Sequence, residues 1–160
     1  MPHFPLHVRL IAVGKISGSH FAAASTDYLA RLRRYLEIEV IEVRTTLGQG
    51  KPEAQALIDE GRELLKHVRE EGKLIALQSE GRQYTSVDFA RWLQKHTGAG
   101  ARKIDFVLGG ASGLSQEVLS RSAQRISLST MTFAHELARV ILLEQLYRAG
   151  TILRGEKYHK

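Results

Sequence analysis

The chain has 160 residues, of which 43% are hydrophobic and 25% charged, the composition of one globular domain with a sizeable core. Its net charge of +6 favours a polyanion such as nucleic acid as partner, although a basic protein without such a partner has the same charge. The absence of cysteine excludes disulfides, thiolate zinc sites and thiol nucleophiles, and it fits a cytoplasmic protein. No apolar run reaches the length of a membrane span and no signal peptide is recognisable, so no membrane association is expected.

Short apolar segments alternate with amphipathic segments along the whole chain. The apolar segments predict strands at residues 6–13, 38–43, 74–78, 104–108 and 126–129. The amphipathic segments predict helices at residues 20–35, 52–69, 86–96, 115–124 and 136–149, with polar loops such as residues 79–82 between elements. Strands that alternate with helices indicate βαβ units, so we expect one α/β domain over residues 1–160, with a parallel β-sheet flanked by helices.

Three arginines, Arg31, Arg33 and Arg34, lie at the end of the first predicted helix. Cations are favoured near a helix C-terminus, which explains the cluster without any ligand. Contact with phosphates is the functional alternative, and the sequence leaves both readings open.

Three predicted loops follow strands directly, at residues 77–81, 109–113 and 128–135. Ligands of open parallel sheets bind beyond the carboxyl ends of the strands, so these loops are the predicted binding site. The middle loop, Gly-Gly-Ala-Ser-Gly, lets a ligand approach its backbone closely, although a plain turn between strand and helix has the same composition. No Gly-Lys-Ser/Thr follows it, which argues against a nucleotide triphosphatase loop.

The seven histidines do not have metal-ligand spacing, so no metal site is expected. His135 is the unusual one, because it lies where the last loop meets the last helix. It is either a helix N-terminal residue with a satisfied side chain or part of a site.

The last predicted helix has apolar residues almost all round, whereas a surface helix has one apolar stripe and one polar face. It therefore needs cover on more than one side, and a second subunit is a plausible cover. Glu144 and Arg148, four residues apart on this helix, form either an ordinary ion pair or part of a site or interface.

Four segments of the last third carry a family resemblance. They are FVLGGASGL at residues 106–114, LSTMTFAHELARV at 128–140, LEQLYRA at 143–149 and ILRGEKYHK at 152–160. In this order and spacing they resemble the small SPOUT-class methyltransferases that methylate N3 of a pseudouridine in bacterial large-subunit ribosomal RNA. The resemblance extends over essentially the full length. One departure is Ala134, where the family often has proline.

The resemblance implies a SPOUT-type domain with a trefoil knot near the C-terminus, a rare exception to the usual threading of chains. It implies S-adenosylmethionine as cofactor, a homodimer built largely on the knotted region and the last helix, and 23S rRNA in the assembled ribosome as substrate. The cofactor positions that it implies are Leu77, Gly109, Leu128, Ser129, Thr130, Met131, Thr132 and Phe133.

The ring nitrogen of the acceptor must lose a proton before or during methyl transfer, so a base, or a cation that stabilises the ring anion, would help. The candidates for these catalytic roles are His135, Arg148, Tyr158 and His159, and the sequence does not single out the base. Arg154 and Lys160 are candidates for phosphate contacts with RNA. The alternative for the tail is a frayed basic terminus. The alternatives for the whole protein are a SPOUT enzyme with another RNA target and a non-catalytic ribosome-binding protein.

Overall fold

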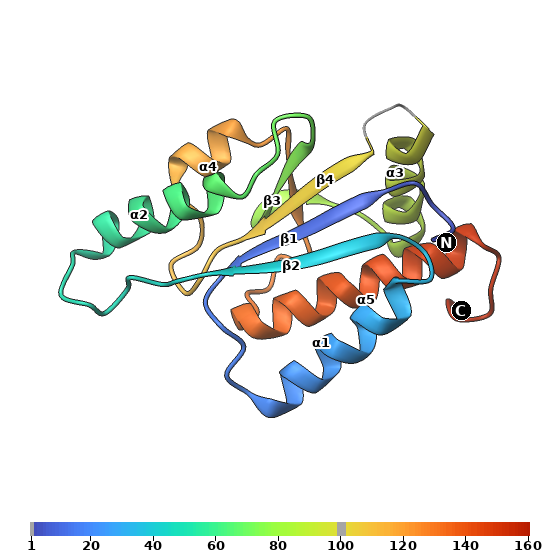
Figure 1. Ribbon diagram of the computed structural model, residues 1–160, viewed down its shortest axis with the longest axis horizontal. Helices are drawn as coiled ribbons and strands as arrows, with labels where there is room; N and C mark the ends of the chain where they lie inside the picture. The colour runs from blue at the N-terminus through green and yellow to red at the C-terminus, as the bar shows by residue number, and fades with distance from the viewer. Residues whose placement is uncertain (1, 99–101) are drawn as a thin grey trace.

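The computed structural model describes residues 2–98 and 102–160. Five parallel strands form one sheet in the order β2-β1-β4-β3-β5, and helices cover both of its faces (Figure 1). The α/β class and the parallel sheet predicted from the sequence are confirmed. In chain order the elements are β1 (His7–Val13), α1 (Ser19–Leu32), β2 (Glu37–Val43), α2 (Glu53–Lys66), β3 (Lys73–Gln83), α3 (Ser86–Gly98), β4 (Lys103–Leu108), α4 (Gln116–Arg121), β5 (Gln124–Ser127) and α5 (His135–Leu153).

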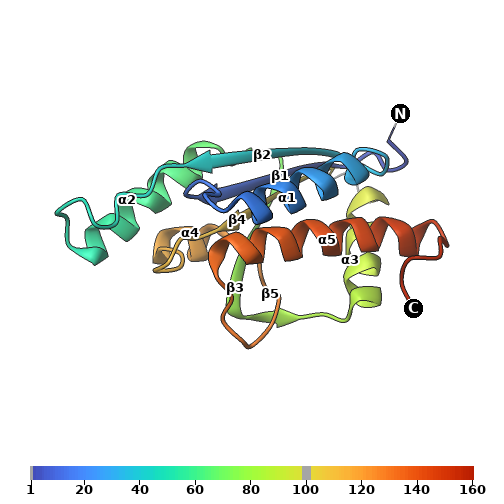
Figure 2. The same ribbon diagram turned by 90° about the horizontal axis from the view of Figure 1, so that it is seen from below.

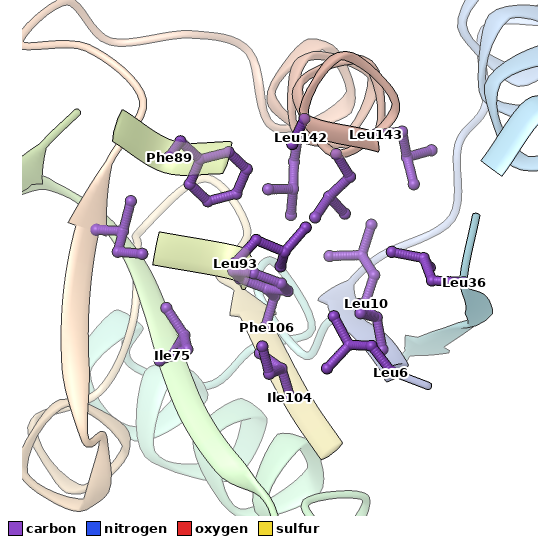
Figure 3. Packing of buried hydrophobic residues seen from close by; sticks show 14 of the residues in the cluster. Leu6, Leu10, Leu36, Ile75, Phe89, Leu93, Ile104, Phe106, Leu142 and Leu143 are labelled. Atoms are coloured by element: carbon purple, nitrogen blue, oxygen red, sulfur yellow. The ribbon is translucent and has the colours of Figure 1, made fainter. Parts of the chain in front are cut away.

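Each face of the sheet has its own apolar core. Helices α1, α3 and α5 cover one face, and α2 and α4 cover the other (Figure 2). Figure 3 shows the first core, where Leu142 and Leu143 of α5 pack with Phe89 and Leu93 of α3 and with Phe106 of β4. Strand β4 is central, and its residues 104–108 are all buried, which is the pattern of a parallel strand covered on both sides.

The polar segment at residues 79–82, predicted as a loop, belongs to β3 instead. Strand β3 pairs with β5 on both sides of a register shift between Leu77 and Arg82. The two strands approach each other closely there, as a Cβ built on Gly81 would lie only 2.7 Å from the backbone carbonyl carbon of Arg125. The segment has the composition of a turn because much of it faces solvent, and only its pairing with β5 keeps it extended.

The observed ends of the helices lie up to four residues from the predicted ends. Helix α4 has six residues and ends at Arg121, before the predicted end at residue 124, and its N-cap is Ser115, whose Oγ accepts a hydrogen bond from Val118 N. Helix α5 extends to Leu153, four residues beyond the predicted end. The trefoil knot implied by the resemblance is consistent with this topology and stays a prediction.

The apolar circumference of α5 is covered largely within the chain. Its buried residues Leu142, Leu143, Leu146 and Ala149 belong to the core that α5 shares with α1, α3 and the sheet. Other apolar residues of α5, including Leu137, Val140 and Ile141, are only half-buried. The chain thus supplies much of the cover for which the sequence suggested a second subunit, and it leaves part of α5 accessible.

A buried ion pair links the central strand β4 to the segment after α2. The Asp105 carboxylate has no exposed surface and accepts hydrogen bonds from Arg69 Nη2 at 2.6 Å, Arg69 Nε at 2.9 Å and Arg69 N at 2.7 Å. These bonds satisfy a charge that would otherwise be costly in the core. Within residues 2–98 and 102–160, no helix is long and apolar enough to cross a membrane.

Candidate active site

Residues 77–80 of β3 and the predicted loops after β4 and β5 meet at one cavity of about 500 Å³. This volume lies in the range of small-molecule sites, about 300–1,000 Å³. Its walls combine apolar side chains with the backbone of irregular segments, which offers N–H and C=O groups to a polar ligand. The cavity is lined by residues 77–80, 108–114, 128–129, 131–135 and 138. The other predicted loop, residues 77–81, is part of β3 rather than a loop.

Seven of the eight predicted cofactor positions line this cavity, and Thr130 does not. His135 also lines it, at the first turn of α5. The lining positions are Leu77, Gly109, Leu128, Ser129, Met131, Thr132 and Phe133.

The glycines of the middle loop are required first by the loop itself. Gly110 and Gly113 form an antiparallel bridge in which Gly113 N donates to Gly110 O at 3.1 Å. A Cβ on Gly109 would lie 2.1 Å from Gly113 O. Gly113 has a φ of +79°, a backbone angle that residues with a side chain rarely adopt. The sequence left open whether these glycines serve close approach of a ligand or a plain turn, and the tight turn already needs them without a ligand.

The connector between β5 and α5 is held by short local hydrogen bonds. Ser127 Oγ donates to Ser129 O at 2.8 Å, and Ser129 Oγ accepts from Met131 N at 3.0 Å. Met131 is 73% exposed although it is large and apolar, and it stands at the edge of the cavity. Ala134 has a φ of −54°, a value that proline also adopts, so alanine at this position keeps a backbone angle that the family proline would have.

Two sets of polar contacts fix the first turns of α5 against the loop after β1 and against β2. Glu136 accepts hydrogen bonds from Ser17 N at 2.8 Å and Ser17 Oγ at 2.9 Å, and the bond from the backbone N–H lowers the pKa of Glu136. Arg139, which is 2% exposed, pairs with Glu42 at 2.7 Å and donates to Gly14 O, while burial lowers its pKa. The sequence gave no sign of these contacts, which hold His135 at the cavity.

The other predicted catalytic residues gather at the far end of α5. Arg148 donates to Glu144 Oε1 from Nε at 2.9 Å and Nη2 at 2.6 Å, and this bond raises the pKa of Arg148. Tyr158 OH donates to the same Glu144 oxygen at 3.2 Å, and Arg148 Nη1 lies 3.2 Å from His159 Nδ1. Glu144 therefore joins the three predicted residues into one cluster, and the tail is attached to α5 rather than frayed.

The ring of Tyr158 packs against two other side chains of this region. Arg148 Cζ lies 4.7 Å from the ring centroid, and the ring of Tyr147 packs edge-on at 4.8 Å. Burial raises the pKa of Tyr158, so its hydroxyl is neutral near pH 7 and acts as a donor. Arg154 and Lys160, the predicted phosphate contacts, are exposed on either side of this turn of the chain.

The predicted catalytic residues therefore fall into two places in one protomer. His135 and Arg148 are 13 positions apart on α5, and a rise of 1.5 Å per residue separates them by about 20 Å along the helix axis. The tail turns back at the end of α5 that lies away from the cavity (Figure 1). Over the described parts of the chain, no group of three or more His, Cys, Asp or Glu could hold a metal ion.

A family model described as "Predicted SPOUT methyltransferase" matches residues 6–159. The chain belongs to the SPOUT methyltransferase family. It is 43% identical over 155 residues to the ribosomal RNA large subunit methyltransferase H of Anaeromyxobacter sp. (strain Fw109-5), with 97% of this chain and 100% of that protein covered. It is 41% identical over 159 residues to the protein of the same name from Clostridium botulinum (strain Langeland), again with 97% and 100% covered.

Solved structures of distant sequence share the fold of this SPOUT family member. A methylase family protein of Haemophilus influenzae Rd KW20 superposes with a TM-score of 0.55 at 14% identity, over 98% of this chain and 71% of that one. A methyltransferase of Legionella pneumophila, solved with the cofactor SAM, superposes with a TM-score of 0.50 at 15% identity, over 91% of this chain and 67% of that one. The recognition made from the four C-terminal motifs is confirmed.

Proposed function

We propose that this protein transfers the methyl group of S-adenosylmethionine to N3 of a pseudouridine in 23S rRNA, acting on the assembled ribosome in the cytoplasm. The observation that carries the proposal is that the segments resembling the family's cofactor loops line one cavity. The relatives that carry the name of a large-subunit rRNA methyltransferase match 97% of this chain, and the net charge of +6 suits a polyanionic substrate.

The cavity fits the donor in size and chemistry. S-adenosylmethionine supplies an electrophilic methyl group on a sulfonium. The backbone of Gly109 and of residues 128, 129 and 131–133 would hydrogen-bond the adenosine portion, and the apolar Leu77, Leu128 and Phe133 would enclose it.

We assign the acceptor chemistry to the cluster at the end of α5. Arg148 stays cationic, because Glu144 raises its pKa, and it stabilises the negative charge that develops on the ring. Because a guanidinium only donates, His159 Nδ1 accepts from Arg148 and the neutral ring carries its hydrogen on Nε2, so His159 takes the N3 proton at Nδ1 after the contact with Arg148 opens. Tyr158 holds the cluster together through Glu144, and Arg154 and Lys160 contact phosphates. His135 orients the methyl donor at the cavity.

A homodimer brings these two places together. One protomer leaves about 20 Å between its cavity and its own tail, too far for direct transfer. In a two-fold symmetric dimer with antiparallel α5 helices, each tail lies at the cavity of the other protomer. The half-buried Leu137, Val140 and Ile141 give such a pairing an apolar surface. We expect a dimer mass in sedimentation at micromolar concentration, and a monomer would contradict the arrangement.

Mixed dimers test whether the site is shared. Gly109→Val removes the cavity of its own protomer, and His159→Ala removes the base that its protomer lends. A dimer of one Gly109→Val and one His159→Ala chain keeps one complete site, if sites are shared, and recovers part of the wild-type rate. If each protomer uses its own tail, the mixed dimer has no complete site and stays inactive.

The proposed activity is tested with labelled donor. Calorimetry should show binding of S-adenosylmethionine, and ribosomes from a strain lacking the gene should accept one methyl group per 23S rRNA. Donor binding with transfer to a different RNA would indicate a SPOUT enzyme with another target. Ribosome binding without donor binding would indicate a non-catalytic ribosome-binding protein.

A further inference from the structure

The C-terminal tail is held by one carboxylate. After α5 the chain reverses at Gly155, which has a φ of +66°, and Glu156 N donates to Thr151 O at 2.9 Å. The Glu156 carboxylate then accepts a hydrogen bond from Tyr35 OH at 2.6 Å and one from Arg34 Nη2 at 3.2 Å. Both donors belong to the connection between α1 and β2, more than 120 positions earlier in the chain. We call the contacts of Tyr35 and Arg34 with Glu156 the tail clip.

The tail clip has a rigid base. The side chain of Tyr35 has no exposed surface, and its ring lies so close to α5 that a Cβ on Gly150 would be 2.7 Å from its Cγ. The rings of His3 and Tyr147 flank it, with centroids 5.9 Å and 5.8 Å away. Burial, followed by the bond to Glu156, raises the pKa of Tyr35 to about 12. A buried tyrosine hydroxyl needs a hydrogen-bond partner, and here the carboxylate of the tail provides it.

The tail clip orders residues that contribute little to the core. None of residues 157–160 is buried, and chain ends of this kind usually fray. Tyr158 N donates to Glu156 O at 3.0 Å, which aims Tyr158 back at Glu144 and places His159 beside Arg148. The position of His159 therefore depends on two attachments, one through Glu156 and one through Glu144.

We propose that Glu156 is a positioning residue for methyl transfer, because the tail clip sets where Tyr158 and His159 meet the acceptor base. The inference rests on the proposed function and adds to it a residue that touches neither donor nor acceptor. Its contribution is orientation: a misplacement of about 1 Å at a reacting group can cost a hundredfold in rate.

The test is single-turnover methyl transfer to ribosomes by the full-length protein. We expect Glu156→Ala to lower the rate by about tenfold to a hundredfold. Tyr35→Phe, which removes only the hydroxyl, should also lower the rate of transfer. It breaks the same contact from the other side, so the test remains possible if the Glu156 variant fails to fold. The affinity for S-adenosylmethionine should stay at the wild-type value in both. Glu37→Gln, an exposed carboxylate two residues from Tyr35, is the matched control and should transfer normally.

A double-mutant cycle separates positioning from general destabilisation. If Glu156 acts through His159, the double variant Glu156→Ala, His159→Ala transfers no more slowly than His159→Ala alone. The inference would be overturned if the rate loss of the double variant equalled the product of the two single losses. It would also be overturned if Glu156→Ala and Tyr35→Phe both transferred at the wild-type rate. Failure of the wild-type protein to methylate ribosomes would instead remove the proposed function, so the two failures are distinguishable.

Discussion

Gly109→Ala is the smallest change that tests the cavity. The added Cβ would lie 2.1 Å from Gly113 O and 2.3 Å from Gly113 C, and both atoms belong to the backbone. To restore an ordinary contact the turn must open by more than about 1 Å, and overpacking of this kind typically costs about 1–3 kcal/mol. Because Gly109 and Gly113 both line the cavity, an opened turn changes its wall. We therefore expect at least about tenfold weaker binding of S-adenosylmethionine, which corresponds to about 1.4 kcal/mol.

Gly110→Ala is the control in the same turn. Its Cβ would lie 3.2 Å from Val13 Cγ1, a side-chain atom that can move by a few tenths of an ångström. Calorimetric titration with S-adenosylmethionine and thermal unfolding should be measured on the same preparations of both variants. Gly110→Ala should stay near the wild type in both measurements. A Gly109→Ala protein with wild-type affinity and wild-type melting temperature would refute the placement of the cofactor against this turn.

Three further predictions concern the core, the tail clip and the tail. Asp105→Ala leaves Arg69 without its buried partner, so we expect a loss of about 3–5 kcal/mol in the free energy of unfolding, measured with urea. Tyr35 has a folded pKa of about 12 against an ordinary value of 10, so its contribution is present below pH 10 and is lost as pH rises to 12. The unfolding free energy should therefore fall by up to about 2–3 kcal/mol more in the wild type than in Tyr35→Phe over this range, and parallel pH profiles would contradict it. Deletion of residues 157–160 should leave donor affinity within about twofold and lower single-turnover transfer more than about a hundredfold, whereas normal transfer would exclude a role for the tail.

The sequence predicted the presence of the strands more accurately than the residues at which they begin and end. Strands β1 and β4 were recognisable because they are apolar runs buried by helices on both faces. The second half of β3 was missed because it is polar and solvent-facing, and its extended form comes from pairing with β5, which no local pattern encodes.

The candidate site also has features that the sequence predicted and features that it did not. The loops after β4 and β5 were predictable because parallel topology brings the carboxyl ends of the strands to one edge of the sheet, whereas residues 77–81 belong to β3 and are not a loop. The contacts that hold the site were not predictable, because Glu156 meets Tyr35, and Arg139 meets Glu42, only after the chain has folded. The separation of His135 from Arg148 was implicit in their spacing on one helix, although the motifs alone suggested a single group of catalytic residues.

The most direct test of the central claim is mass mapping of 23S rRNA from a strain that lacks the gene, before and after complementation. We predict that deletion removes one methyl group from N3 of a single pseudouridine, and that the wild-type gene restores it while the Gly109→Val gene does not. An unchanged methylation pattern in the deletion strain would contradict the proposed function.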